Sequence, residues 1–295
     1  MTTEKKAPAR PRSGPIDIHT HTFPDALAPR ALLSLMQKSH TRPFADATNE
    51  GLGASMREAG IALSVVQPVA TSPQQVVKVN DTAIRVNEQA AETGIMSFGA
   101  MHPDYTSCAD ELKRLKAAGI RGVKLHPPYQ GVDFDDPRYL RILEAAGALG
   151  LTVLIHAGLD IGLPGARQAT PEKVKNAVRQ VGPVRLVLAH MGGWRCWDRV
   201  LELLTDAPVM LDTSFSLGRI TPGDDGHPWT EEALTMLSAE EFVDMVRAFG
   251  AERVLFGTDS PWGGQRECVA QFMRLPLSDR EKALILRENA EKLLL

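Results

Sequence analysis

Short apolar runs alternate along the chain with longer segments whose apolar residues recur at helical spacing. Eight runs have the length and composition of strands, and they cover residues 16–21, 61–69, 95–101, 122–126, 151–156, 184–190, 209–213 and 254–258. Helical spacing is found between them, for example over 108–118, 137–149, 171–181 and 231–249. The alternation predicts parallel βαβ units, and eight such units close an α/β protein into a (β/α)8 TIM barrel.

An open, doubly wound sheet is the alternative architecture for strands that alternate with helices. Such a sheet usually carries a Gly-rich phosphate-binding loop after its first strand. The first run here ends instead in DIHTHT (residues 17–22), which contains no glycine, so the barrel is favoured. We also expect a helical insertion over residues 25–58 and an additional C-terminal helix over 278–293.

The composition of this 295-residue chain limits the number of domains and the classes of partner that we expect. Residues 1–14 offer little to bury and are expected to be a disordered tail, while residues 15–295 are expected to form a single domain. A net charge of −3 gives no electrostatic reason to expect nucleic acid or a membrane. The N-terminus lacks the apolar segment of a secretory signal, and the three cysteines show no CxxC spacing. We therefore expect a cytoplasmic protein that acts on a small molecule, with homo-oligomer formation left open.

Histidines and one aspartate lie where the strand-like runs end. Asp259 ends the last run, and five of the eight histidines end earlier ones: His19, His21, His126, His156 and His190. The C-terminal ends of all barrel strands open onto one face, so these side chains are predicted to converge there. Residues i and i+2 of a strand share a side, which suits two imidazoles that bind one divalent ion. The set predicts a metal centre, for which Zn²⁺ is favoured and manganese or iron is also compatible.

The segments that carry these residues resemble the amidohydrolase superfamily, in the amidohydrolase-related branch that includes the aminocarboxymuconate-semialdehyde decarboxylase type. The similarity covers nearly all of residues 15–295. Its segments read IDIHTH (16–21), GVKLHP (122–127), LIHAG (154–158), LAHMGG (188–193) and FGTDSPW (256–262). The resemblance implies that the metal ligands are His19, His21, His156 and Asp259. It also implies that His190 is a catalytic histidine or a ligand to a second metal ion.

The resemblance implies a metal-dependent hydrolase that uses a metal-activated water on a small amide, lactone or ester. Asp259 would take the proton of that water and deliver it to the leaving group, and His190 would polarise the carbonyl group. The alternative is a non-oxidative decarboxylase or hydratase that uses the same site on a small aromatic or dicarboxylic acid. A non-catalytic binding module on a barrel would be expected to lack ligands, yet all four are present.

Lys124 leaves the number of metal ions open. In two-metal members of the superfamily a lysine on the fourth strand is carboxylated and bridges the ions. Here His126 follows Lys124 at i+2 and is expected to point the same way, so both cannot easily bridge. We favour one ion, with Lys124 or His126 in contact with the substrate, with a second ion or with a metal ligand.

Other residues are predicted to support or line the site. Alternation places Asp17 on the face of His19, one layer deeper, where it would orient a ligand or serve as a buried structural carboxylate. His102 ends the third run and is expected to line the pocket.

Tryptophans and arginines in the loops on the active face are candidates for substrate contacts. Trp262 follows the last run, and the other indoles predicted to form an apolar wall are Trp194, Trp197 and Trp229. Arg195 and Arg219 are the candidates for binding a substrate carboxylate.

Overall fold

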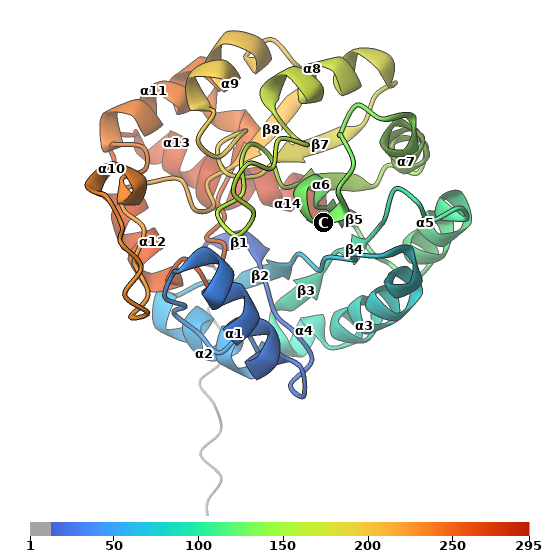
Figure 1. The fold of residues 1–295 in the computed structure, drawn as a ribbon, viewed down its shortest axis with the longest axis horizontal. Helices are drawn as coiled ribbons and strands as arrows, with labels where there is room; N and C mark the ends of the chain where they lie inside the picture. Colours follow the sequence, from blue (N-terminus) through green and yellow to red (C-terminus); the bar gives the residue numbers. More distant parts are fainter. Residues whose placement is uncertain (1–12, 295) are drawn as a thin grey trace, which may run out of the picture.

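The computed structural model describes residues 13–294, and its strands close into a parallel barrel ringed by helices (Figure 1). The strands are β1 (Ile16–Thr20), β2 (Leu63–Val66), β3 (Ile95–Ser97), β4 (Gly99–Ala100), β5 (Gly122–Leu125), β6 (Thr152–Ile155), β7 (Arg185–Leu188), β8 (Val209–Asp212) and β9 (Val254–Leu255). β3 and β4 are two pieces of one strand, interrupted at Phe98, so eight positions surround the barrel. The predicted (β/α)8 fold is confirmed.

Backbone hydrogen bonds close the ring between its first and last strands. The amide of Ile18 donates to the carbonyl of Phe256 (2.9 Å), and the amide of Asp259 donates to the carbonyl of His19 (2.8 Å). The register of β1 against β2 shifts between Asp17 and Thr20, which marks a β-bulge in the first strand.

The helices lie outside the strands. They are α1 (Ala28–Ser39), α2 (Asn49–Ala59), α3 (Val76–Glu88), α4 (Ala90–Thr93), α5 (Cys108–Ala117), α6 (Pro127–Gln130), α7 (Pro137–Ala148), α8 (Pro171–Gln180), α9 (Trp197–Leu204), α10 (Glu231–Leu234), α11 (Ala239–Phe249), α12 (Gln265–Met273), α13 (Asp279–Ala283) and α14 (Asn289–Leu294). The predicted insertion over 25–58 forms α1 and α2, and α2 packs beside α12. Within the described residues, no helix combines the length and the apolar composition that crossing a bilayer requires.

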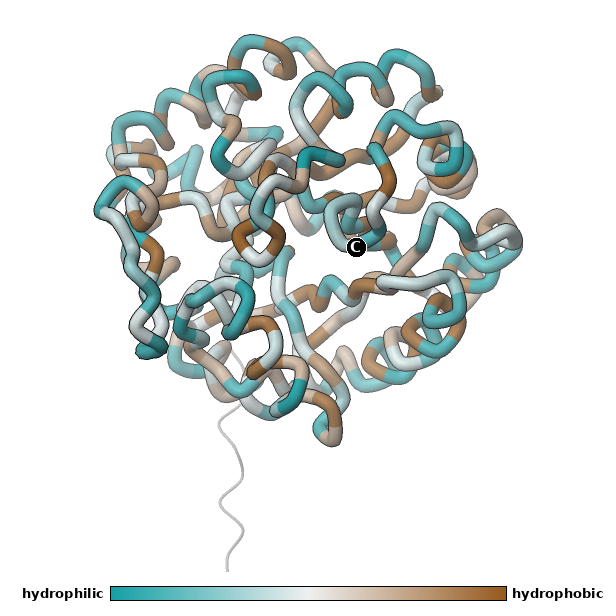
Figure 2. Tube along the Cα trace, viewed as in Figure 1, coloured by the Kyte–Doolittle hydropathy of each residue, from teal (hydrophilic) through white to brown (hydrophobic). Residues whose placement is uncertain are grey.

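Hydrophobic side chains form two layers, one inside the ring of strands and one outside it. The inner layer fills the barrel and includes Ile18, Val65, Phe98, Leu154 and Val187, all of them buried. The outer layer lies between strands and helices, and the helices of the ring carry both hydrophobic and hydrophilic residues (Figure 2). Because the inner layer seals the barrel, polar side chains at the C-terminal strand ends face a mouth rather than a channel.

Two predicted helices are interrupted. Residues 231–249 form α10 and α11 because Ser238 begins a new helix with a capping box to Glu241. The intervening residues pair with another loop, where the amide of Met236 donates to the carbonyl of Gly218 (2.8 Å). The C-terminal helix predicted over 278–293 is likewise split, into α13, a π-helical turn over 284–288 and α14. Most of the predicted tail, residues 1–12, lies outside the described residues.

Candidate metal centre

Three predicted ligands from opposite ends of the chain meet at the barrel mouth. The Nε2 atoms of His19 and His21, at the end of β1, lie 3.2 Å apart. The Oδ1 atom of Asp259, after β9, lies 3.4 Å from His19 Nε2 and 3.2 Å from His21 Nε2. One divalent ion binds imidazole and carboxylate atoms at ~2.0–2.2 Å, a bond length that three donor atoms at these separations can satisfy together. The residues therefore fit a metal centre.

The ring of His19 is oriented by a carboxylate on its far side. Its Nδ1 lies 2.8 Å from Oδ2 of Asp212, the last residue of β8, and a carboxylate can only accept. The hydrogen of this imidazole therefore sits on Nδ1, and the lone pair of Nε2 lies on the side of His21 and Asp259. That tautomer is the one a metal ligand requires.

His156 and His190 each have one ring nitrogen beside a backbone carbonyl and the other facing the neighbouring imidazole. Nε2 of His156 lies 2.8 Å from the carbonyl oxygen of Leu159, and Nδ1 of His190 lies 3.1 Å from that of Ser214. Each carbonyl requires the hydrogen on the nitrogen beside it. The remaining atoms, His156 Nδ1 and His190 Nε2, are then two lone pairs only 3.0 Å apart. A metal ion or a proton between the two nitrogens removes this repulsion, so the pair is suited to bind one or the other.

Burial keeps these rings in the form that binds metal. It lowers the pKa of His19, His126 and His156, and it lowers the pKa of His190 to about 3. Neutral imidazole is the ligand form of histidine. Burial alone would raise the pKa of Asp259, but the hydrogen bond from His21 and the nearby imidazoles hold that pKa below its usual range. The aspartate therefore supplies the anionic oxygen of the cluster.

The backbone of the site contains several residues in the left-handed region. His190 has φ 61°, Met191 φ 52° and Asp259 φ 64°, values that non-glycine residues adopt at a cost of order 1–3 kcal/mol each. The structure holds His190 from both sides: its amide donates to Asp212 Oδ1 (3.1 Å), and its carbonyl accepts from the indole of Trp197 (3.0 Å). Strain held in this way is typical of functional sites.

A second cluster lies beside the first. The Nε2 atoms of His126 and His156 each lie 3.6 Å from Oδ2 of Asp160, and the two imidazoles stack with centroids 4.4 Å apart. His156, predicted to bind the same ion as His19, thus has one nitrogen toward this cluster and the other toward His190. Sequence reasoning missed Asp160, which lies in a loop four residues beyond His156 and carries no strand-end signal.

Lys124 projects from β5 into the barrel mouth and is only 1% exposed. Its Nζ lies 3.1 Å from His19 Nε2, the same atom that faces His21 and Asp259. Burial lowers the pKa of Lys124 to about 8, although neighbouring aspartates, Asp212 first, oppose the shift. The structure therefore places a nitrogen of Lys124 directly beside the proposed ligands, whereas His126 lies in the second cluster.

Asp17 was expected to orient a ligand or to serve as a buried structural carboxylate, and its contacts are those of the second role, in a strand whose register shifts between Asp17 and Thr20. The Asp17 carboxylate accepts from Gln265 of α12 (2.7 Å) and from Thr258 (2.6 Å), and also from the amide of His19 (3.2 Å). Burial raises the pKa of Asp17 to about 7 against these hydrogen bonds. Its contacts tie β1 to the chain after β9, whereas Asp212 orients the ring of His19.

The remaining predicted residues lie outside the two clusters. His102 is buried, and its Nδ1 accepts from the amide of Asp104 (3.1 Å). Arg195 donates to backbone carbonyls of Ala233 and Thr235 and lies over the ring of Trp194, and Arg219 pairs with Glu231. Both guanidinium groups therefore already have partners away from the clusters.

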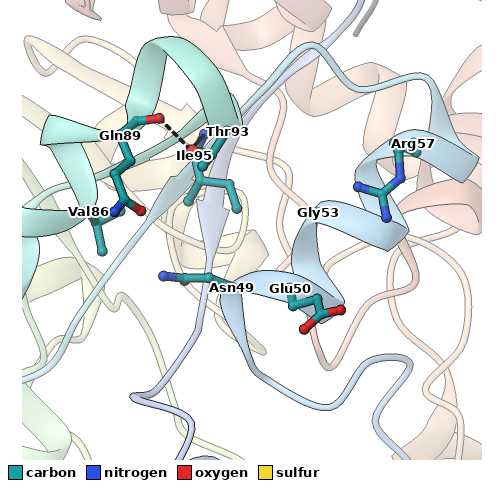
Figure 3. A pocket seen from close by; sticks show the side chains of 8 residues that line it. All are labelled: Asn49, Glu50, Gly53, Arg57, Val86, Gln89, Thr93 and Ile95. Carbon is teal, nitrogen blue, oxygen red and sulfur yellow. Dashed lines mark hydrogen bonds between the residues drawn. The ribbon is translucent and has the colours of Figure 1, made fainter. Parts of the chain in front are cut away.

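Two cavities lie apart from the clustered histidines. One of about 250 Å³ is lined by Trp262, Phe44, Phe215 and other residues between the β8 and β9 ends and α12, and its lining includes neither these histidines nor Asp259. The other, of about 220 Å³, lies on the outside of the barrel between α2 and the α3–α4 segment, beside Arg57 and Gln89 (Figure 3). Trp262 therefore lines a neighbouring cavity, and of the other predicted tryptophans Trp194 is buried with Ile220 and Met236, with Trp229 packed against them.

A closed parallel barrel with a His/Asp cluster at its C-terminal mouth defines a class of metal-dependent barrel proteins. The family model described as Amidohydrolase matches residues 16–295. The chain therefore belongs to the amidohydrolase family, as the resemblance in sequence indicated. A search of curated proteins finds no match.

Solved structures share the fold over almost the whole chain. An uncharacterised TIM-barrel protein from Bordetella bronchiseptica is 18% identical with a TM-score of 0.72, and the match covers 95% of this chain and 98% of that one. The 2,6-dihydroxybenzoate decarboxylase from Rhizobium is 16% identical with a TM-score of 0.62, covering 95% and 98%. The 5-carboxyvanillate decarboxylase from Novosphingobium aromaticivorans, complexed with manganese and a nitrobenzoic acid, is 14% identical with a TM-score of 0.68, covering 95% of both chains. At these identities the likeness shows a shared fold.

Proposed function

We propose that the protein is a metal-dependent, non-oxidative decarboxylase of a small aromatic acid, rather than the hydrolase that the sequence alone favoured. The observation that carries a metal-dependent enzyme is the convergence of His19, His21 and Asp259 within 3.4 Å at the barrel mouth. What supports decarboxylation is that structures similar over 95% of the chain include decarboxylases of aromatic acids.

In this proposal a single divalent cation is held by His19, His21, His156 and Asp259. When bound, it supplies Lewis acidity that withdraws electron density from a substrate oxygen. Manganese is the first metal to test, because a structurally similar decarboxylase is complexed with it, and zinc is the second. Lys124, beside His19, supplies a donor and a positive charge that suit a carboxylate group.

Decarboxylation of an aromatic acid replaces a carbon–carbon bond by a carbon–hydrogen bond. A proton adds to the ring carbon that bears the carboxylate, the bond to that carboxylate then breaks, and its electron pair returns to the ring as carbon dioxide leaves. His190 Nε2 and Asp259, both unprotonated in the resting site, are the groups at the cluster able to accept a proton from the acidic substrate and pass it to the ring carbon. Their burial excludes bulk water from the reacting carbon.

The test is an assay of the manganese-loaded and zinc-loaded protein with dihydroxybenzoates and carboxyvanillates, performed in D2O. We expect release of carbon dioxide and one deuterium at the carbon that lost the carboxylate. His190→Gln should lower the rate by ~10²-fold or more, because it removes a proton-transfer group. His102→Gln, a change of another buried histidine outside both clusters, is the matched control and should keep the rate.

Turnover of lactones, esters or amides without release of carbon dioxide would contradict this proposal and restore the hydrolase. Equal losses in His190→Gln and His102→Gln would contradict a specific role for His190, because replacing any buried histidine would then lower the rate. Circular dichroism of both variants separates unfolding from a catalytic effect.

A further inference from the structure

The end of β8 places Asp212 and Ser214 between imidazoles that come from two other strands. Both residues are fully buried. We propose that Asp212 and Ser214 form a positioning pair that fixes the tautomers of His19 and His190, so that one bare nitrogen of each ring points into the metal centre. The inference rests on the proposed function only in treating these histidines as part of a cation site.

The surroundings of the Asp212 carboxylate consist of donors. Oδ2 faces Nδ1 of His19 at 2.8 Å. Oδ1 accepts from the amide of His190 (3.1 Å), from the amide of Ser214 (3.0 Å) and from the hydroxyl of Ser214. Only a group that accepts on both oxygens satisfies this arrangement. An asparagine would turn its NH2 group against one set of donors, and a buried clash of donors leaves hydrogen bonds unmade at a cost of ~1–3 kcal/mol.

Ser214 extends the influence of this carboxylate to the second ring. Because its hydroxyl hydrogen is donated to Asp212, its oxygen lone pairs are free to accept. That oxygen lies 3.0 Å from His190 Nδ1 and 2.9 Å from His19 Nδ1. The two rings, 5.4 Å apart between centroids, therefore share one hydroxyl and one carboxylate on the side away from the metal centre.

The pair also restrains the backbone of His190. This residue has φ 61°, and its amide is buried with Asp212 Oδ1 as its acceptor. The same carboxylate thus sets the ring of His19 and the backbone position of His190. A change at Asp212 is expected to disturb both histidines together. Ser214→Ala removes only the shared hydroxyl: His19 Nδ1 keeps the Asp212 carboxylate, and His190 Nδ1 keeps the weaker neutral acceptor, the Ser214 carbonyl.

A purely structural reading is that Asp212 only caps the turn at 212–214, since its Oδ1 accepts from the Ser214 amide two residues on. That role would affect stability without altering the tautomers of imidazoles on other strands. Imidazole 15N NMR distinguishes the two readings, because protonated and bare ring nitrogens have different chemical shifts.

The experiment compares the wild-type chain with Asp212→Asn and Ser214→Ala. Asp244→Asn, on the exposed face of α11, is the matched control. Isothermal titration with Mn²⁺ measures metal affinity, and 15N NMR of the metal-free proteins measures the tautomers. We expect Asp212→Asn to raise the Kd for Mn²⁺ by ~10–100-fold and to mix the tautomers of His19. Ser214→Ala should change the His190 signals with a smaller effect on Kd, and Asp244→Asn should change neither.

A folded Asp212→Asn variant with wild-type Kd and wild-type tautomers would overturn the proposal. If Asp212→Asn does not fold, Ser214→Ala decides, and unchanged His190 signals in that variant would overturn it. A wild-type protein that binds no metal would instead contradict the proposed function, while the tautomers of the metal-free chains would still test the positioning pair. The two failures are therefore distinguishable.

Discussion

Each imidazole at the barrel mouth uses its two nitrogens differently, and this division decides the chemistry of the site. His19, His156 and His190 each present one nitrogen to an oxygen of the protein and the other to the clustered ligands. The sequence identified these histidines because they end strands. It placed Asp212 at the end of the seventh run, where it serves the site or caps a loop, but it did not show which ring Asp212 faces. The other acceptors are backbone carbonyls, which every residue carries.

Loss of the first pair of ligands should abolish metal retention. In His19→Ala/His21→Ala, two of the three closest donor atoms disappear, and Asp259 remains as the third. We expect a metal content near zero after incubation with Mn²⁺ or Zn²⁺ and desalting, measured by elemental analysis.

The matched control is His40→Ala/His227→Ala. These two imidazoles stack with centroids 3.9 Å apart, and His40 pairs with Asp225. Its metal content should equal that of the wild type. Full metal content in His19→Ala/His21→Ala would show that the ligands are assigned wrongly.

At the scale of elements, the strands and their irregularities determine which side chains enter the mouth. Alternation predicted Asp17 and His19 on one face, but the bulge in β1 interrupts that alternation, and Asp17 contacts Gln265 and Thr258 while the ring of His19 contacts Asp212. A bulge depends on how β1 pairs with β2 and on the residues packed against that pair, which the local pattern does not contain.

The outer layer contains a polar link between α3 and α5. Glu111 of α5 forms that link and should make stability depend on pH. It accepts from Asn80 of α3 (2.6 Å) and from Arg114 (2.7 Å). Burial alone would raise the pKa of Glu111, but these hydrogen bonds outweigh it and hold the pKa below 4.5. The folded state therefore binds its proton later than the unfolded chain as pH falls. The stabilisation is fully present above pH 4.5 and is lost as pH falls through the folded pKa.

Glu111→Gln should lower the free energy of unfolding by ~1–2 kcal/mol at neutral pH, because hydrogen bonds to a buried charged group are lost. The difference from the wild type should shrink as the pH falls below 4.5. Urea unfolding across this range measures both effects, with Glu92→Gln on exposed α4 as the control. A difference that stays constant with pH would contradict the assignment.

At the scale of the whole molecule, the metal centre lies where the barrel closes. His19 and Asp259 are 240 positions apart in sequence, yet the amide of Asp259 bonds to the carbonyl of His19. A cation shared by these residues would bind the folded barrel and not the unfolded chain. Metal binding should therefore appear as global stability.

Mn²⁺ at ~100 times its Kd should stabilise the fold by ~2.7 kcal/mol, because it binds only the folded state. We expect a rise in Tm of several degrees relative to protein treated with a chelator, measured by calorimetry. His19→Ala/His21→Ala should show no such rise. An equal rise in that variant would indicate that the ion stabilises the protein at another place.

The sequence by itself determined the class of fold and the residue types at the strand ends. Hydrophobic periodicity and the residues that begin and end each run are local signals, and they recur in all eight units. It also identified the segments that mark the amidohydrolase family. Only the tertiary structure decided the contacts of Asp17, the partners of Arg195 and the acceptors behind each imidazole. These depend on distances between strands remote in the chain, and such distances are set by barrel closure and packing rather than by any local pattern.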